Sequence, residues 1–322
     1  SVLDRSKIRP LFRGDDGDAL WVDSFGLTHP DNHIAQRFGH DYADKRNEDI
    51  ARLNMLMQSG GVYSRYRGLV TGYDGRVDLD VWRTNGDTVH FLDVLHRIGD
   101  FEDRNTRRVL EVGSGDGRII AAAAKNGVSI TDADSTDVSF FAGNATKRNI
   151  ESVVRARGIK TRQIAGKGIE KLDGRYDRIY ASPPYIPQQG TGLIRELIEQ
   201  GVHHLNVDNP NAAMYMKYSS LADAEVAEYL RAYGDLFDVE VVDEGYELPL
   251  KIAMDDRWVE RLRERGGLIE KDPAHNGGFA HWHRLRVIRL KPKQLTLDYK
   301  NGSSRTIPAD IRVFGRERFN EL

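Results

Sequence analysis

Hydrophobic and polar positions along the middle of the chain follow two periods in turn. Short apolar runs such as Val109–Val112 and Arg178–Ala181 predict buried strands, and apolar residues at helical spacing follow most of these runs. The expected strands are 109–112, 128–137, 161–165, 178–181, 212–218, 239–242 and 285–290, and the expected helices are 89–98, 119–125, 138–157, 193–205 and 221–233. Strands that alternate with helices predict an α/β fold, in which helices cover both faces of a parallel sheet.

The two ends of the chain show weaker patterns. Residues 1–43 are polar and rich in turns, and residues 246–281 are rich in glycine and charge. The further expected elements are a helix at 44–58, a strand at 77–82 and a hairpin formed by 294–301 and 305–314. We therefore expect an N-terminal accessory region for substrate recognition (1–100), a main domain (101–293) and a C-terminal extension (294–322).

Two N-terminal segments carry side chains that could bind a nucleic acid or a metal. Tyr63–Gly68 mixes tyrosine and arginine, which suits either base stacking or a half-buried connector, and we favour the connector. His29, His33 and His40 have no acidic or thiol partner at a metal-binding spacing. We therefore interpret the three histidines as loop or surface residues and expect no metal.

Three glycines alternate over five positions between an expected strand and an expected helix. Glu111 stands in the strand, Gly113, Gly115 and Gly117 follow it, and the helical pattern begins at Ile119. A turn this tight requires glycine, and it lets a ligand lie against bare backbone at a helix N-terminus. Because dinucleotide-binding folds use a similar turn, the glycines alone predict a ligand site without identifying the ligand.

A second loop, Ser182-Pro183-Pro184-Tyr185, follows the expected strand at 178–181. Two successive prolines fix φ twice, remove two N–H donors and leave carbonyl groups free to accept hydrogen bonds. Together with the Ser182 hydroxyl, these carbonyls suit an NH₂ group, and Tyr185 can stack on a flat group beside it. Both loops follow the carboxyl ends of strands, where parallel sheets bind ligands, so we expect them to face one cleft.

Composition limits the class of protein further. The 322 residues carry a formal net charge of −2 and include no cysteine. The absence of cysteine excludes disulfides and thiolate metal sites, and the small negative charge argues against a nucleic-acid partner. Residues 1–20 are charged rather than apolar, and no apolar run approaches the roughly 20 residues of a membrane span. We expect a cytoplasmic protein without a membrane partner.

The two loops together resemble a known class of enzyme. Glu111–Gly117 followed by Ser182–Tyr185 is similar to the class I S-adenosylmethionine-dependent methyltransferases, and within them to amino-methyltransferases with an (Asn, Asp or Ser)-Pro-Pro-aromatic signature. The chain most resembles the protein-glutamine N5-methyltransferases of release factors. The resemblance implies a Rossmann-like sheet, seven-stranded and mostly parallel, with an N-terminal accessory domain and a C-terminal hairpin extension.

Further residues follow the spacing of that family. Its acidic-Ile-Ser turn and the Ala and Asn of the next helix correspond to Asp137-Val138-Ser139, Ala142 and Asn149, and its Pro-Pro-Tyr-Ile-Pro is present as Pro183–Pro187. Arg83–Thr88 loosely resembles the family's Arg-Pro-Glu-Thr-Glu segment. Two positions differ, because Ser182 stands where the glutamine-modifying enzymes carry Asn, and Gly166–Gly168 lacks the usual acidic residue.

The resemblance implies a cofactor, S-adenosylmethionine, and a set of site residues. The implied cofactor-binding residues are Glu111, Gly113, Gly115, Gly117, Asp137 and Thr88. Asp137 would accept the ribose hydroxyls, and Asp132 and Asp134 are its alternatives. Ser182 and the Pro183 carbonyl would orient the target nitrogen while Tyr185 packs on it.

These expectations describe an N-methyltransferase acting on a planar nitrogen of a small, amino-acid-like molecule. The alternatives are a glutamine in a protein, or adenine or cytosine in nucleic acid. A guanidinium acceptor also needs a carboxylate to remove a proton, for which Asp87, Glu196 and Glu247 are unranked candidates. A non-enzymatic nucleotide binder is disfavoured, since it has no need for a loop that orients NH₂.

Overall fold

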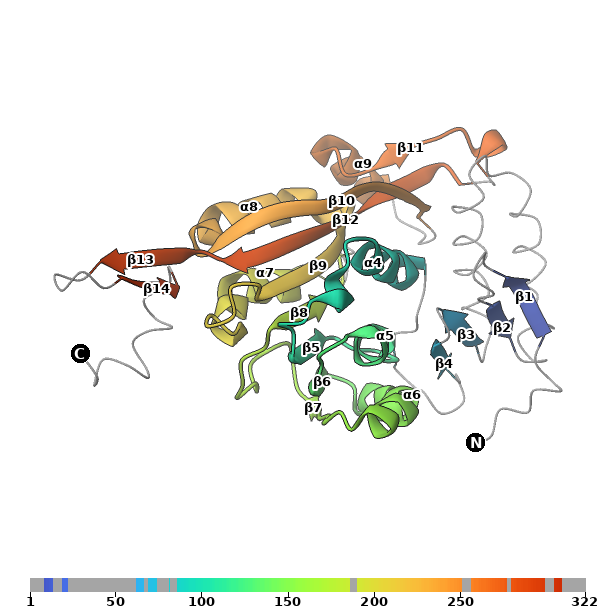
Figure 1. Cartoon of the computed structure of the whole chain (residues 1–322). Coiled ribbons are helices and arrows are strands. Elements are labelled where there is room, and N and C mark those ends of the chain that lie inside the picture. Colours follow the sequence, from blue (N-terminus) through green and yellow to red (C-terminus); the bar gives the residue numbers. More distant parts are fainter. Residues whose placement is uncertain are drawn as a thin grey trace.

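A computed structural model describes the protein at residues 9–13, 19–22, 62–66, 69–73, 81, 86–185, 190–250, 256–276, 279–298 and 304–308. A central sheet carries helices on both faces, and smaller sheets lie towards the two ends of the chain (Figure 1). The central strands are β5 (Arg108–Val112), β6 (Asp132–Asp137), β7 (Gln163–Ala165), β8 (Arg178–Ala181), β9 (Ala213–Ser219), β10 (Phe237–Pro249), β11 (Ile269–Glu270) and β12 (His281–Pro292).

The order of these strands defines the topology. The strands lie in the order β10-β12-β9-β8-β5-β6-β7, and β11 pairs with β12 outside this path. β5 pairs in parallel with both β6 and β8, so the chain leaves β5 on one side and later returns on the other. β12 is antiparallel to β9 and β10. The sheet is mostly parallel and its path has seven strands, as expected, and the short β11 adds an eighth strand beside β12. Its switch point lies between β5 and β8.

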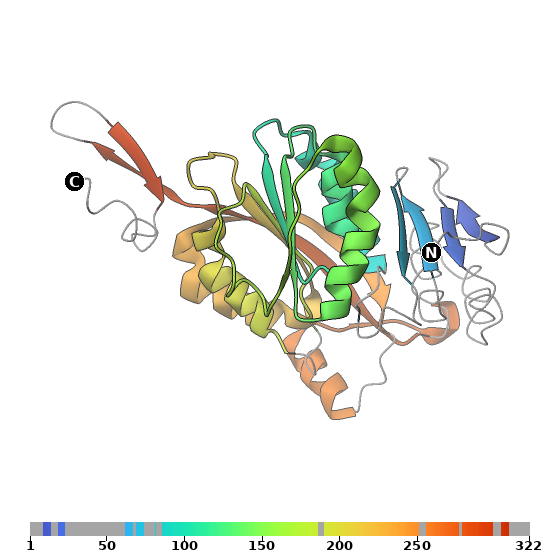
Figure 2. The same cartoon turned by 90° about the horizontal axis from the view of Figure 1, so that it is seen from below.

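Helices cover the two faces in separate layers (Figures 1 and 2). In the described part of the chain they are α4 (Gly86–Arg97), α5 (Arg118–Asn126), α6 (Phe140–Arg157), α7 (Gly192–Gln200), α8 (Asp223–Tyr233) and α9 (Asp256–Arg265). Successive residues of β5 enter opposite cores: Val109 packs in the layer of α4 and α5, and Leu110 in the layer of α7 and α8. The buried run Ala121–Ala124 has small side chains, which let α5 approach its neighbours closely.

A four-stranded antiparallel sheet precedes this domain. Its strands are β1 (Arg9–Arg13), β2 (Ala19–Val22), β3 (Val62–Tyr66) and β4 (Leu69–Tyr73). The expectation of a connector at Tyr63–Gly68 is wrong, because β3 pairs there with β4, which follows it directly, and with β2, which lies far earlier in the chain. Leu69 of β4 joins the core beneath α4 and α5. The expected helix at 44–58, most of the expected strand at 77–82, and His29, His33 and His40 lie outside the described residues.

The segment after residue 236 holds more regular structure than its sequence suggests. β10 runs from Phe237 to Pro249, well beyond the expected strand at 239–242. The charge-rich stretch 246–281 contains the end of β10, then α9, β11 and a short 3-10 helix, η6 (Pro273–His275). The C-terminal hairpin is present as β13 (Gln294–Asp298) paired with β14 (Ser304–Pro308).

Helix α4 is part of the central core. Phe91, Leu92 and Leu95 are fully buried in the cluster that also contains Val109 and Ile119. The apolar core therefore continues across residue 100, near which we expect a domain boundary. Along the described residues, no helix is long and apolar enough to cross a membrane.

Candidate active site

One row of paired residues crosses the carboxyl ends of the parallel strands. Val112 of β5 pairs with Thr136 of β6 on one side and with Ala181 of β8 on the other, and Ala181 pairs with Met216 of β9. The next residues along these four strands are Gly113, Asp137, Ser182 and Lys217. Because neighbouring strands lie about 4.8 Å apart, the row brings both predicted loops to the same edge of the sheet, at its switch point.

The glycine turn adopts backbone conformations that favour glycine. Gly113, Gly115 and Gly117 have φ values of 71°, 51° and 75°. The N–H groups of Gly113 and Ser114 donate to the Thr136 carbonyl at 2.9 and 3.0 Å, which holds the turn against the end of β6. The turn leads directly into α5, whose first N–H groups have no carbonyl partner within the helix.

Gly117 also permits close packing between the turn and α6. A Cβ on this residue would lie 2.7 Å from Thr146 Cγ2 and 2.8 Å from Thr146 Cα. The Thr146 hydroxyl lies 3.1 Å from Ser114 Oγ and 3.3 Å from the Gly115 carbonyl. This predicted cofactor residue therefore lets α6 support the turn from behind.

Asn149 connects the same turn to the N-terminal sheet. Its Nδ2 donates to the carbonyls of Gly72 and Asp116, at 3.0 and 2.7 Å, and its Oδ1 accepts from Gly72 N–H at 3.0 Å. One amide side chain thus satisfies both backbone groups of a β4 residue and one carbonyl of the glycine turn.

The three candidate ribose ligands lie in different surroundings. Asp137 is at the turn, where its carboxylate accepts from Gly115 N–H and Ser139 N–H, both at 2.9 Å. Asp134 is buried and accepts from Arg162 and from Tyr176, whereas Asp132 begins β6 at the opposite end. Of the three, only Asp137 is placed at the carboxyl edge, and its ribose role stays a prediction.

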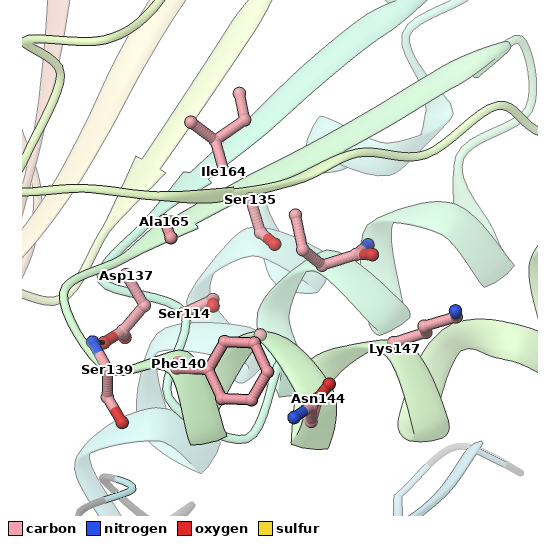
Figure 3. A pocket seen from close by; sticks show the side chains of 11 residues that line it. Ser114, Ser135, Asp137, Ser139, Phe140, Asn144, Lys147, Ile164 and Ala165 are labelled. Atoms are coloured by element: carbon pink, nitrogen blue, oxygen red, sulfur yellow. Dashed lines mark hydrogen bonds between the residues drawn. The ribbon is translucent and has the colours of Figure 1, made fainter.

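A hollow opens beside Asp137, between the ends of β6 and β7 and the start of α6 (Figure 3). Ser114 and Asp137 provide polar walls, whereas Phe140 and Ile164 provide apolar ones. Phe140 exposes 71% of its surface and its ring faces the hollow. Phe140 and Ile164 are absent from the sequence prediction, because the exposure of an apolar side chain cannot be read from the sequence. The aromatic residue three positions after Asp137 was the available signal.

Glu111 lies beneath the turn rather than on its surface. Its Oε2 accepts from Ile120 N–H at 2.8 Å, so the carboxylate caps the first turn of α5. Burial raises the pKa of Glu111 well above its ordinary value, and the nearby Asp116 and Asp137 raise it further. The predicted cofactor-lining residue thus also holds the helix that follows the turn.

The second loop, Ser182–Tyr185, which we call the acceptor loop after its predicted role, presents Ser182 half-buried, Pro183 buried and Tyr185 half-buried. The Tyr185 hydroxyl donates to Asp87 Oδ2. Asp87 and Thr88 are both buried at the start of α4. Thr88 therefore lies on the acceptor side, next to the loop's partner, and it is not among the residues that line the hollow beside Asp137.

The three acidic candidates for a base are now separated by position. Asp87 touches the acceptor loop through Tyr185. Glu196 accepts from Ile169 N–H at 2.9 Å, and Glu247 is paired with Lys271 and Arg284. Only Asp87 among them contacts Tyr185 in the described structure.

The comparisons with known proteins concern the part of the chain that carries both loops. Residues 94–214 match the family model described as Methyltransferase small domain. This match covers less than half of the chain and supports a methyltransferase domain, and the strand order is that of a Rossmann-like α/β sheet.

The chain is also similar to a release factor glutamine methyltransferase from Rhodopirellula baltica. The two are 32% identical over 157 residues, which are 41% of this chain and 52% of the relative. The chain thus spans about half the length of the curated relative it matches.

Solved methyltransferase structures are similar to the chain at low sequence identity. The ribosomal protein L11 methylase from Lactobacillus delbrueckii subsp. bulgaricus is 16% identical, with 66% of this chain and 81% of that chain covered and a TM-score of 0.40. A putative RNA methyltransferase from Pyrococcus horikoshii is 13% identical, with 77% and 98% covered and a TM-score of 0.45.

Proposed function

We propose that this chain is an S-adenosylmethionine-dependent N-methyltransferase that acts on a planar nitrogen of a small, amino-acid-like molecule. The single observation that carries the proposal is the row at the switch point. There the glycine turn, Asp137 and Ser182 follow directly on paired positions of β5, β6 and β8. A cofactor site and an acceptor loop at one sheet edge is what a transfer reaction between two bound molecules requires.

The residues of the turn fit this cofactor. A carboxylate has about four acceptor positions, and the hydrogen bonds from Gly115 and Ser139 to Asp137 leave capacity for the two hydroxyls of a ribose. Phe140 and Ile164 supply apolar surface for a purine ring beside that carboxylate. When bound, S-adenosylmethionine supplies an electrophilic methyl group on a sulfonium. The chain's own contribution is to hold the glycine turn in position and to place Asp137, and Glu111 supports the turn by capping α5.

The acceptor loop fits a nitrogen with a delocalised lone pair. Ser182 Oγ and the Pro183 carbonyl are hydrogen-bond acceptors for N–H groups, and the ring of Tyr185 offers a face for a planar group. Hydrogen bonds that favour a pyramidal nitrogen strengthen as its lone pair becomes available for attack. Ser182 and Pro183 therefore orient the nitrogen, Tyr185 packs beside it, and the proton it loses passes to solvent or to a carboxylate.

A glutamine in a protein is the second candidate acceptor, since the curated relative is named for that substrate. We favour a small molecule because Ser182 replaces the Asn of the glutamine-modifying enzymes, which shortens the acceptor and removes an amide donor. A cytoplasmic location and the absence of nucleic-acid and membrane partners belong to the same proposal, and they rest on composition alone.

The proposal is tested by binding and by transfer. We expect wild-type protein to bind S-adenosylhomocysteine in calorimetry and to transfer a tritiated methyl group to a member of a panel. The panel consists of L-glutamine, L-arginine, a glutamine-containing peptide and DNA. Asp137→Asn should weaken cofactor binding by about tenfold, the effect of one lost charge-assisted hydrogen bond. Asp132→Asn is the matched control on the same strand and should leave binding unchanged. Absence of binding by the wild-type protein would overturn the proposal.

A further inference from the structure

Behind Tyr185 lies a group of buried polar side chains from four parts of the chain. Asp87 starts α4, Lys217 lies in β9, His283 lies in β12, and Tyr185 follows β8. Asp87, Lys217 and His283 expose only 5%, 1% and 4% of their surface. We call these four residues the Tyr185 clamp. Their meeting point is next to Ser182, since Lys217 and Ser182 follow paired residues in the row described above.

The clamp holds Tyr185 both at its hydroxyl and on its ring. The hydroxyl donates to Asp87 Oδ2, and Lys217 Nζ donates to the same oxygen at 2.8 Å. Lys217 Nζ also lies 4.9 Å from the centroid of the Tyr185 ring. The centroid of the His283 ring lies 5.6 Å from that of Tyr185, and Ser219 Oγ holds His283 Nδ1 at 2.8 Å. Contacts on three sides fix both the position and the rotation of the tyrosine ring.

The charges in the clamp balance. Burial opposes ionisation of Asp87, but the Lys217 ammonium beside it holds the pKa of that carboxyl below its ordinary value. Burial lowers the pKa of His283 to about 4, so this ring is neutral at pH 7. Burial and the Asp87 charge keep the pKa of Tyr185 well above its ordinary value, so its hydroxyl remains a donor. The clamp thus contains one carboxylate and one ammonium at neutral pH.

Stability does not account for this arrangement. A buried ion pair costs desolvation energy, and apolar side chains of similar volume are often as stabilising or more so. Lys217 stands within the buried run of β9, where its neighbours Met216 and Tyr218 are apolar in body. What the pair does, and an apolar replacement cannot do, is to hold the hydroxyl and the ring of Tyr185 at once.

We infer that Lys217 and Asp87, supported by His283, are positioning residues that orient the Tyr185 ring against the methyl acceptor. This inference rests on the proposed function. Misplacing a reacting group by about 1 Å can reduce the rate about a hundredfold, so the clamp acts on turnover. It acts little on cofactor affinity, because the glycine turn and Asp137 lie on β5 and β6 whereas the clamp lies on the far side of Ser182.

The test uses a double variant, Asp87→Asn with Lys217→Met, which removes both charges and strands neither of them in the core. A matched control exists in the same sheet. Tyr180 donates to Asp100 Oδ2 at 2.6 Å, and Arg178 pairs with Asp100 at 2.7 Å, both deeply buried. Asp100→Asn with Arg178→Met removes a buried pair beside a tyrosine that does not belong to the acceptor loop. It also removes the ion pair of Arg178 with Asp103 at 2.7 Å, so the control disrupts at least as many buried charge contacts as the clamp variant does.

Three measurements on the whole chain of 322 residues separate positioning from stability. Calorimetry with S-adenosylhomocysteine gives cofactor affinity, and tritium transfer to the acceptor panel above gives kcat and KM. Carbon NMR of ring-labelled tyrosine, with Tyr185→Phe to assign the signal, reports the orientation of the Tyr185 ring. We expect the clamp variant to shift and broaden the Tyr185 signal and to lose about tenfold to a hundredfold in kcat. Its cofactor affinity should be unchanged, and the control pair should alter neither kcat nor the Tyr185 signal.

The outcomes distinguish failure of this inference from failure of the proposed function. Unchanged kcat, or an unchanged Tyr185 signal in a folded clamp variant, overturns the inference and leaves the proposed function standing. An equal loss of kcat in the control variant assigns the effect to stability and also overturns it. Failure of wild-type protein to bind S-adenosylhomocysteine overturns both. If wild-type protein binds the cofactor but labels no acceptor in the panel, the Tyr185 signal alone decides.

Discussion

At the scale of the single residue, His283 links stability to pH. A histidine of ordinary pKa 6.5 that is held near 4 by burial stays neutral in the folded protein while the unfolded chain becomes protonated. The unfolded state therefore binds more protons between these two values. The stability from His283 is fully present above about pH 6.5 and is lost as the pH falls towards 4.

We predict that this dependence disappears in His283→Phe, which keeps a buried ring without a titratable nitrogen. Between pH 6.5 and 4 the wild-type protein should lose ~3 kcal/mol more unfolding free energy than the variant. Urea denaturation at several pH values measures the difference. His275→Gln replaces a histidine whose side chain is 82% exposed, and it should track the wild type. Parallel curves for wild type and His283→Phe would refute the prediction.

The sequence predicted the residues of the two loops, but it did not predict the residues that pack behind Tyr185. Gly113, Asp137, Ser182 and Tyr185 belong to local motifs, and the structure places all four along one sheet edge. Lys217 is the single charged residue of β9, and His283 is one of several polar residues along β12, so neither belongs to a local motif. The position of Lys217 next to the acceptor loop follows only from the strand register, which pairs Met216 with Ala181.

At the scale of elements, the glycine turn couples β5 to the packing of α5 on α6. Gly117 and Gly158 both have positive φ, of 75° and 66°, but a Cβ at Gly158 would meet nothing within 4 Å. Replacing either by alanine costs about 1 kcal/mol for the backbone conformation. Gly117→Ala adds an overpacking cost of about 2 kcal/mol against Thr146.

We therefore predict that Gly117→Ala destabilises the protein clearly more than Gly158→Ala does, and that it alone weakens cofactor binding. Thermal unfolding with and without S-adenosylhomocysteine measures both effects. Equal losses of stability in the two variants would mean that backbone strain, and not contact with Thr146, explains the glycine.

Elements with a strong internal pattern were predicted from sequence, and those stabilised by distant partners were not. Helices α4 to α8 and strands β5, β6, β8 and β9 lie close to their expected positions. β10 was predicted too short because its second half is acidic. In the structure Glu240, Glu244 and Glu247 lie opposite Arg289, Arg286 and Arg284 of β12. A strand stabilised by cross-strand charge pairs shows no hydrophobic alternation in its own sequence.

At the scale of the whole molecule, the proposed domain limits can be tested by truncation. Phe91, Leu92, Val94 and Leu95 of α4 are fully buried, and each contributes about 1.5–3 kcal/mol on burial. We predict that a chain of residues 101–322 does not unfold cooperatively. A chain of residues 1–293, which lacks only the hairpin region, should keep its melting temperature and its cofactor binding. Thermal melts followed by circular dichroism show whether each truncated chain unfolds cooperatively. A cooperative transition for residues 101–322 would contradict the prediction and support a domain boundary near residue 100.

The segment that matches the family model, residues 94–214, includes Tyr185 and excludes the other three clamp residues. It contains the glycine turn and Asp137, whereas Asp87 precedes it and Lys217 and His283 follow it. The two loops are therefore encoded in one stretch of the gene, and the three side chains that hold Tyr185 are encoded in the flanking stretches. Exchange of those flanking stretches between related chains would change what supports Tyr185 while both loops are inherited unchanged.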